Sequence, residues 1–266
     1  VLTPSPFSAL RAWHTEHGLD PEAGLRTLFG PYDQDTDHPW HRLERGEVSV
    51  ADAMTRIKAA AADQGLDLDP LEMLRAVGRN FGVRADVVEK ILALRAAGYR
   101  TALVTNNVRE YADGWRALIP AADMFDLMVD SSAVGMRKPD PRIYRMALEQ
   151  LGVGADESVF LDDAAGNVEA ARALGMHAIL VGDEYRGALA ELGPYARTSR
   201  GRPRRYLLLN GIFEGCPHRA GIFREDIPHV EHAVRAHRPP RFVHLGADFV
   251  HLLADRLLHF LVGQFV

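Results

Sequence analysis

Polar residues able to hold a phosphate group follow two short apolar runs in this 266-residue chain. Thr105 and Asn106 follow the run that begins at 101, and the carboxylates Asp162 and Asp163 follow the run at 158–161. Between these groups stands Lys138, one of only three lysines among 31 basic residues. Hydroxyl and amide groups donate hydrogen bonds to phosphoryl oxygens, and an ammonium adds a compact positive charge. These residue types therefore predict binding of a small phosphorylated substrate.

The paired carboxylates indicate a divalent cation. Carboxylates repel a phosphate group unless a metal ion lies between them, and Mg²⁺ takes one or two carboxylate oxygens together with water. We therefore expect Mg²⁺ as the cofactor. Each group alone has a plainer interpretation, since Thr105-Asn106 is compatible with a turn, Asp162-Asp163 with a helix N-cap, and Lys138 with a surface position. Their order along the chain favours a single site.

Alternating strands and helices must position these residues. Short apolar strands are expected at 101–105, 124–129, 158–161 and 177–181, with helices at 108–118, 140–151 and 167–174. Strands that are apolar along their length are buried on both faces, which predicts a doubly wound α/β fold with a parallel sheet. Ligands bind outside the carboxyl ends of the strands in such a sheet, so all three groups are expected at one edge.

The two ends of the chain differ in character from this central part. Residues 5–98 have helical periodicity throughout, with Gly98 as a C-terminal stop. Residues 197–266 carry a net charge of +5 and seven of the 12 histidines, whereas the rest carries −10. This shift predicts a basic, His-rich C-terminal extension over 197–266. Its apolar end, 249–266, is compatible with packing on the domain or with a homodimer contact.

Composition excludes several classes of protein. A net charge of −5 gives no overall nucleic-acid signal, and no run of 18 apolar residues predicts a membrane span. The single cysteine, Cys216, excludes an internal disulfide framework, and no secretory signal is visible, so a cytoplasmic location is expected. The histidines at 229, 232 and 237 have loose metal-ligand spacing without a glutamate between the first two, and they carry less weight.

The ordered motifs resemble those of the haloacid dehalogenase-like hydrolase superfamily. Val104-Thr105-Asn106 looks like its second motif, the segment 135–144 around Lys138 like its third, and 159–163 with Asn167 like its fourth. The closest similarity is to the phosphatase-type N-terminal domain of soluble epoxide hydrolases, over about residues 1–195. The resemblance implies a helical cap at 5–98, inserted after the first strand, and an α/β core at 99–196. Residues 1–4 would be the remnant that follows the first strand.

The resemblance also implies roles for the site residues. Thr105 and Lys138 would be catalytic, and both would bind the phosphoryl group together with Asn106. Asp163 aligns with the carboxylate that binds Mg²⁺ directly, and Asp162 would act on the metal through water or through its ligands. Asn167 stands in the outer part of the site, where the family often has a further acidic residue.

One motif of the family is missing. Its nucleophilic aspartate ends the first strand, just before a segment like Val1-Leu2-Thr3, so we expect the nucleophile upstream of Val1 and an inactive chain as printed. The implied reaction is Mg²⁺-dependent hydrolysis of a phosphate monoester through an aspartyl-phosphate. A haloacid dehalogenase is an alternative, although adjacent Asp162 and Asp163 would repel its anionic substrate. The missing motif also leaves open a non-catalytic binding module that retains the fold.

Overall fold

The computed structural model describes residues 1–79, 82–116, 119–195 and 206–210, which fall within one compact unit spanning Val1–Cys216. Other segments, including Cys216, the three histidines named above and 249–266, lie outside the described residues. None of the helices that the structure describes has the length and apolar character needed to cross a membrane.

The N-terminal part forms a helical unit with a core of its own. Its helices are α1 (Pro6–Glu16), α2 (Pro21–Phe29), α3 (Pro39–Glu44), α4 (Val50–Asp63) and α5 (Pro70–Arg79). Proline at the start of α1, α2 and α3 suits the first turn, where a helix has no use for the missing N–H. Ser49 caps α4 by accepting from the Asp52 amide at 3.1 Å. Leu28, Phe29, Trp40 and Ile57 are among the buried residues that hold these helices together.

A parallel five-stranded sheet forms the second part. Its strands are β1 (Arg100–Thr105), β2 (Leu127–Asp130), β3 (Ser158–Asp162), β4 (His177–Leu180) and β5 (Tyr206–Asn210), in the order β2-β1-β5-β3-β4. All neighbouring strands in this order pair in parallel, which confirms the α/β prediction. The strand expected at 124–129 begins only at Leu127, because Ala121–Met124 forms the short helix α8. The helix expected at 108–118 is divided into η1 (Arg109–Tyr111) and α7 (Ala112–Arg116).

Strand β5 comes from the segment that the charge shift placed in a C-terminal extension. Leu209 pairs with Leu103 of β1 on one side and with Leu161 of β3 on the other, so 206–210 lies inside the sheet. A boundary near residue 197 therefore does not separate this strand from the core. The apolar run 206–210 by itself is compatible with a strand, but the charge shift was averaged over 70 residues and so grouped this run with its basic surroundings.

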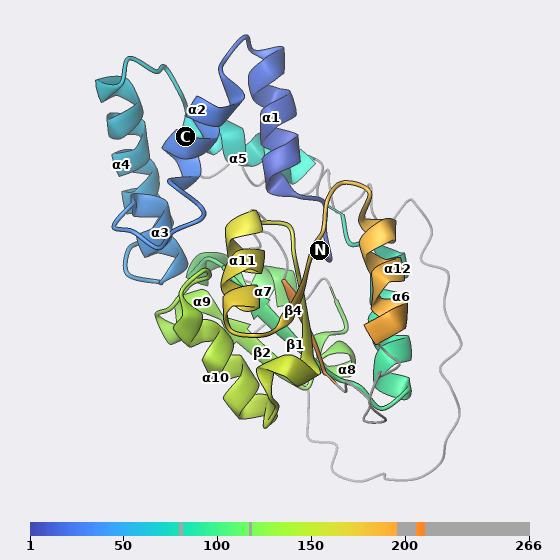
Figure 1. Cartoon of the computed structure of the whole chain (residues 1–266). Helices are drawn as coiled ribbons and strands as arrows, with labels where there is room; N and C mark the ends of the chain where they lie inside the picture. The colour runs from blue at the N-terminus through green and yellow to red at the C-terminus, as the bar shows by residue number, and fades with distance from the viewer. Residues whose placement is uncertain (80–81, 117–118, 196–205, 211–266) are drawn as a thin grey trace, which may run out of the picture. The chain divides into compact units, whose positions relative to one another are not determined.

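Helices cover both faces of the sheet (Figure 1). Helices α10 (Pro141–Leu151) and α11 (Ala165–Ala173) contribute Ile143 and Ala171 to a buried cluster with Phe160. Helices α6 (Ala85–Ala96) and α12 (Tyr185–Tyr195) pack on the other face, where Ile91 joins Leu103. Helix α6, which falls within the cap predicted at 5–98, thus packs against the sheet. The short elements α9 (Ser131–Val134) and η2 (Ala155–Glu157) complete the fold.

Candidate active site

Strand β1 brings Thr105 and Asn106 to the carboxyl edge of the sheet. Thr105 is buried, and its Oγ1 donates to the carbonyl oxygen of Asn106 at 3.2 Å. The Asn106 side chain makes two hydrogen bonds to the backbone of Lys138. Its Oδ1 accepts from the Lys138 amide at 2.7 Å, and its Nδ2 donates to the Lys138 carbonyl oxygen at 3.0 Å. Asn106 therefore fixes the loop that carries Lys138 against the end of β1.

Lys138 links the two strands that flank β5. Its Nζ donates to the Val104 carbonyl oxygen of β1 at 2.8 Å and to Asp162 Oδ2 of β3 at 2.9 Å. Both side chains of this ion pair are fully buried. An ammonium is tolerated at such a depth only when it is paired and hydrogen-bonded. The lysine is thus a built-in charge at the sheet edge rather than a surface residue.

Asp162 is surrounded by donors from its own side of the sheet. Besides Lys138, its Oδ1 accepts from the Ala164 amide at 2.8 Å and its Oδ2 from Asn167 Nδ2 at 3.1 Å. Burial raises the pKa of Asp162 above its ordinary value, and the charge of Lys138 acts against that rise. Three groups predicted for the site, Lys138, Asp162 and Asn167, are therefore joined in one buried network.

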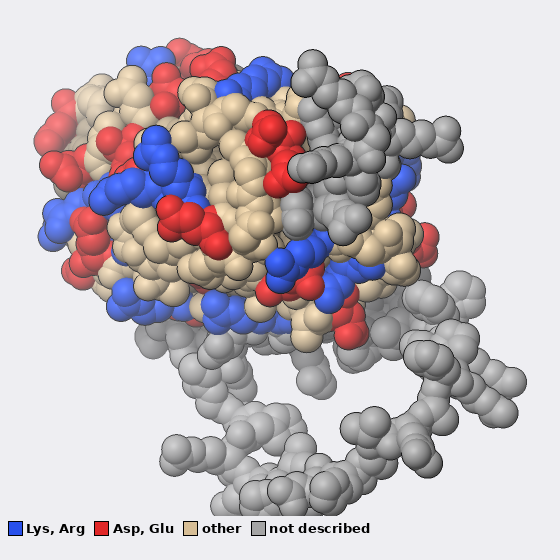
Figure 2. Space-filling model, turned by 60° about the horizontal axis from the view of Figure 1, so that its bottom comes forward, with Lys and Arg blue, Asp and Glu red and all other residues tan. Residues whose placement is uncertain are grey.

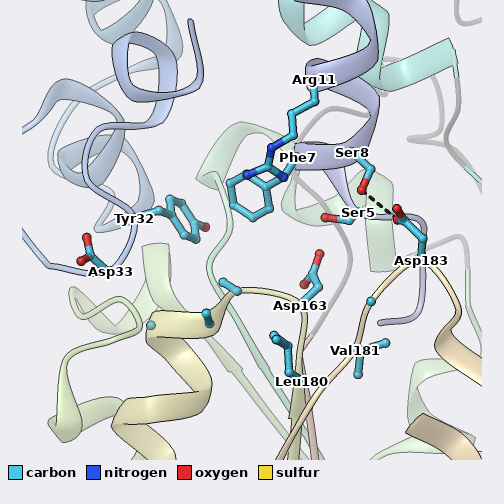
Figure 3. Close-up of a pocket in the computed structure, with 14 residues that line it drawn as sticks. Ser5, Phe7, Ser8, Arg11, Tyr32, Asp33, Asp163, Leu180, Val181 and Asp183 are labelled. Carbon is cyan, nitrogen blue, oxygen red and sulfur yellow. Dashed lines mark hydrogen bonds between the residues drawn. The ribbon is translucent and has the colours of Figure 1, made fainter. Parts of the chain in front are cut away.

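Asp163, the next residue, turns the other way and lines a cavity of about 400 Å³ (Figure 3). Ser5 donates a hydrogen bond to its carboxylate. Burial tends to raise the pKa of Asp163, and the hydrogen bond from the Ser5 hydroxyl acts against that rise. A partly exposed carboxylate thus faces the cavity, whereas Asp162 is buried and paired with Lys138.

Residues from the helical unit form the opposite wall of this cavity. Phe7 and Tyr32 lie there with their ring centroids 5.0 Å apart, and Arg11 reaches the same space (Figure 3). At the other side Ser8 donates to Asp183 at 2.8 Å. The cavity therefore combines an aromatic wall with charged and hydroxyl groups, a lining suited to a small polar molecule.

The helical unit approaches the start of α11 closely. A Cβ built on Gly166 would lie 2.5 Å from the Cα of Asp33, so only glycine fits at this position. Gly166 and its neighbours Ala164 and Ala165 line the cavity, where the first turn of α11 offers backbone N–H groups. The close approach thus helps to form the cavity between Asp33 and the end of β3.

A family model described as haloacid dehalogenase-like hydrolase matches residues 11–175, well over half of the chain. The chain belongs to the haloacid dehalogenase-like hydrolase family. This confirms the resemblance drawn from the motifs around Thr105, Lys138 and Asp163.

Relatives of this chain include proteins named as phosphatases and epoxide hydrolases. It is 29% identical over 198 residues to Acyl-CoA dehydrogenase family member 10 of Mus musculus, covering 72% of this chain and 18% of that protein. It is 36% identical over 114 residues to Bifunctional epoxide hydrolase 2 of Rattus norvegicus, covering 41% and 20%. It is 37% identical over 110 residues to the plasmid Phosphoglycolate phosphatase of Cupriavidus necator, covering 41% and 48%. The chain thus spans between about a fifth and a half of these relatives.

The fold of the hydrolase also matches a solved structure. A dehalogenase with an intermediate complex superposes with a TM-score of 0.50 at 21% identity, covering 73% of this chain and 92% of that one. At this identity the match indicates a shared fold and nothing about activity.

Asp163 is the carboxylate of the pair that could hold Mg²⁺. Its carboxylate faces the cavity, whereas the Asp162 oxygens already accept three hydrogen bonds or ion-pair contacts. Within the described residues, no three His, Cys, Asp or Glu side chains converge on a metal site. Mg²⁺ commonly takes one or two carboxylates and fills its shell with water and substrate phosphate oxygens. One protein carboxylate at this place is therefore compatible with the ion.

The sequence did not reveal which residues of the helical unit reach the site. Tyr32 and Arg11 line the cavity, and Glu44 pairs with Arg137, the neighbour of Lys138. Arg137 lies inside the motif segment 135–144, and this is a signal that was present in the sequence. Glu44 and Tyr32 lie in helical or loop segments whose periodicity says nothing of their distant partners.

Proposed function

We propose that this hydrolase is a Mg²⁺-dependent phosphatase that acts on a small phosphate monoester. Two features of the sheet edge support the proposal. Lys138 is held between β1 and β3 by hydrogen bonds to Val104 and Asp162. Asp163, the residue after Asp162, faces a cavity of about 400 Å³. This combination supplies a fixed positive charge and a hard oxygen ligand at one sheet edge. Relatives that are named as phosphatases support the same activity.

In the proposed reaction, residues of this chain bind and neutralise the phosphoryl group. The Thr105 hydroxyl and the backbone N–H of Asn106 would donate hydrogen bonds to its oxygens, because the Asn106 side chain is already bonded to Lys138. Lys138 would balance the charge of the group. Asp163 would hold Mg²⁺, which when bound neutralises negative charge on the phosphate. Asp162 and Asn167 would keep Lys138 in place through their hydrogen bonds.

The attacking carboxylate is proposed to be an aspartate joined to the chain on the amino side of Val1. Val1 is buried, and its backbone nitrogen lies close enough to Asp163 and Asp162 to interact with their charges. A residue joined to that nitrogen would therefore enter the site. This aspartate would attack phosphorus and release the alcohol, and water would then hydrolyse the acyl phosphate. This second step would release inorganic phosphate and regenerate the free carboxylate.

Hydrolysis of p-nitrophenyl phosphate tests the proposal. The chain as printed is compared with a chain extended before Val1 by a strand that ends in aspartate, each with and without Mg²⁺. We expect Mg²⁺-dependent turnover from the extended chain and none above background from the printed one. Strong turnover by the printed chain would place the nucleophile among its own residues, and no turnover by either would argue against a phosphatase.

Two substitutions sharpen the metal assignment. Asp163→Asn replaces a charged oxygen ligand by a neutral amide and should weaken Mg²⁺ binding in calorimetric titration by about tenfold or more. Asp162→Asn should weaken it less, because that carboxylate faces Lys138. Equal effects from both changes would contradict the assignment of Asp163 as the direct ligand.

A second assay separates the dehalogenase alternative. The cavity-facing carboxylate of Asp163 would repel the carboxylate of a haloacid unless a cation lay between them. We therefore expect no halide release from 2-chloropropionate by the extended chain. Phosphate binding without turnover by the extended chain would instead support a binding module.

A further inference from the structure

A buried ion pair joins the helical unit to the loop that carries Lys138. Glu44 ends α3, Arg137 precedes Lys138, and both side chains are fully buried. The Nε of Arg137 donates to Glu44 Oε2, and its Nη1 donates to the Gln34 carbonyl oxygen at 2.9 Å. The arginine thus reaches from the sheet edge into the helical unit and is held there at two points.

The Glu44 carboxylate has further partners on both sides. Its Oε1 accepts from the Tyr32 hydroxyl and from Trp40 Nε1, each at 2.8 Å. Its Oε2 lies 3.5 Å from Asn106 Nδ2, the amide that also donates to the Lys138 carbonyl oxygen. One carboxylate therefore contacts Tyr32, whose ring lines the cavity. It also contacts Arg137, which precedes Lys138, and Asn106, which is hydrogen-bonded to the Lys138 backbone.

Backbone contacts dock the same segment against the sheet. The Ser131 hydroxyl donates to the Glu44 carbonyl oxygen at 2.6 Å. A Cβ on Gly46 would lie 2.4 Å from the Ser132 carbonyl oxygen, so the chain runs closely past α9. These backbone contacts hold Glu44 against the sheet, and they do not depend on the charge of its side chain.

We propose that Glu44 is a positioning residue, which sets the place of Lys138 at the sheet edge through Arg137 and Asn106. The inference rests on the proposed function for its meaning, since Lys138 is the group that would balance the charge of the phosphate. Arg137 brings a charge into the interior, and among the described residues it is paired with Glu44 and, 3.7 Å from Nη1, with Asp35. A buried ion pair commonly stabilises the folded state less than a hydrophobic pair of equal size. A role in holding the geometry of the site would explain why an ion pair is present here.

The three lysines of the chain make a direct test feasible. Protein labelled with ¹⁵N-lysine shows amide signals for Lys58, Lys90 and Lys138 alone, and their hydrogen exchange reports local opening. The Lys138 amide is bonded to Asn106, whereas Lys90 lies in α6 on the far part of the core. Lys90 therefore serves as an internal reference for the stability of the whole domain.

Three variants separate positioning from stability. Glu44→Gln removes the charge and keeps a carbonyl oxygen for Tyr32 and Trp40. Glu44→Gln combined with Arg137→Met removes both charges, so no unpaired ion is buried and the melting temperature should recover relative to the single change. Glu47→Gln is the matched control, because Glu47 pairs with Arg45 in the same segment but is 39% exposed.

We expect the Lys138 amide to exchange at least about tenfold faster, relative to Lys90, in the single and the double variant. The ratio should be unchanged in Glu47→Gln. Binding of inorganic phosphate with Mg²⁺ should weaken by about tenfold in the same two variants. If the single variant does not fold, the double variant carries the test.

Two outcomes would overturn the inference. One is an unchanged exchange ratio of Lys138 to Lys90 in the double variant, and the other is phosphate affinity that recovers together with its melting temperature. Either result would make the pair a structural contact only. Absence of phosphate binding by the wild-type protein, with the exchange ratio still altered in both variants, would reject the phosphatase and support Glu44 as a positioning residue.

Discussion

Replacing Lys138 by methionine should strongly destabilise the domain. The side chains of Lys138 and Asp162 are fully buried and their charged atoms lie 2.9 Å apart. Methionine has a similar length but no charge, so Asp162 would remain as a buried carboxylate whose donors within the described part of the chain are the Ala164 amide and Asn167. Removing one partner of a buried pair typically costs about 3 to 5 kcal/mol of unfolding free energy.

The loss should depend on pH. Burial already raises the pKa of Asp162, and removing the lysine, which lowers it, raises that pKa further. An acid whose pKa is higher in the folded state binds protons more tightly there, so its stabilising effect is present at low pH. It is lost as the pH rises through the folded-state pKa. The variant should therefore recover part of its stability on acidification, by up to about 1.4 kcal/mol per pH unit relative to wild type.

Urea unfolding followed by circular dichroism at pH 5, 6, 7 and 8 measures both effects. The double variant Lys138→Met with Asp162→Asn serves as the control, because it leaves no buried charge and should be more stable than the single variant at pH 7. A single variant within about 1 kcal/mol of wild type at pH 7 would show that the pair is not buried as described. A loss that does not change with pH would refute the account of Asp162.

Three further predictions follow from other parts of the fold. A chain ending at residue 195 lacks β5, which leaves β1 and β3 without their shared partner, so it should lose the cooperative thermal transition that a chain ending at Cys216 retains, as seen by circular dichroism. Burial, helped by the charge of Arg137, lowers the pKa of His41 to about 3. The unfolded chain then binds a proton at His41 below about pH 6.5, whereas the folded chain does not. The unfolding free energy should therefore decrease as the pH is lowered below about 6.5, by up to about 1.4 kcal/mol per pH unit. His41→Gln should flatten that dependence between pH 6.5 and pH 4, and an equal slope in both proteins would contradict it. Gly166→Ala should destabilise by about 1 to 3 kcal/mol through its clash with Asp33, whereas Gly182→Ala, with no atom within 4 Å, should leave the urea midpoint nearly unchanged.

Local sequence patterns were sufficient for the parallel strands and for the sheet edge at which the polar residues gather. Apolar runs at 101–105 and 158–161 are buried in the sheet because their residues are apolar along their length. Their polar ends then meet at one edge because parallel strands end on the same side. The chemistry of Thr105 and Asp163 could be proposed for the same reason, since residue type and strand end are both readable from the chain. Lys138 lies between α9 and α10, and its chemistry was proposed from its residue type and its motif.

The tertiary structure decided what local patterns do not encode. Strand β5 enters between β1 and β3, although the average charge of its surroundings differs from that of the core. Asp162 and Asp163 are neighbours of one type, yet the alternation of side chains after β3 turns one to Lys138 and the other to the cavity. Glu44 and Arg137 stand 93 residues apart, and only the docking of the helical unit on the sheet brings them into contact. Such pairings depend on how whole elements pack, and periodicity within one element carries no information about its distant partner.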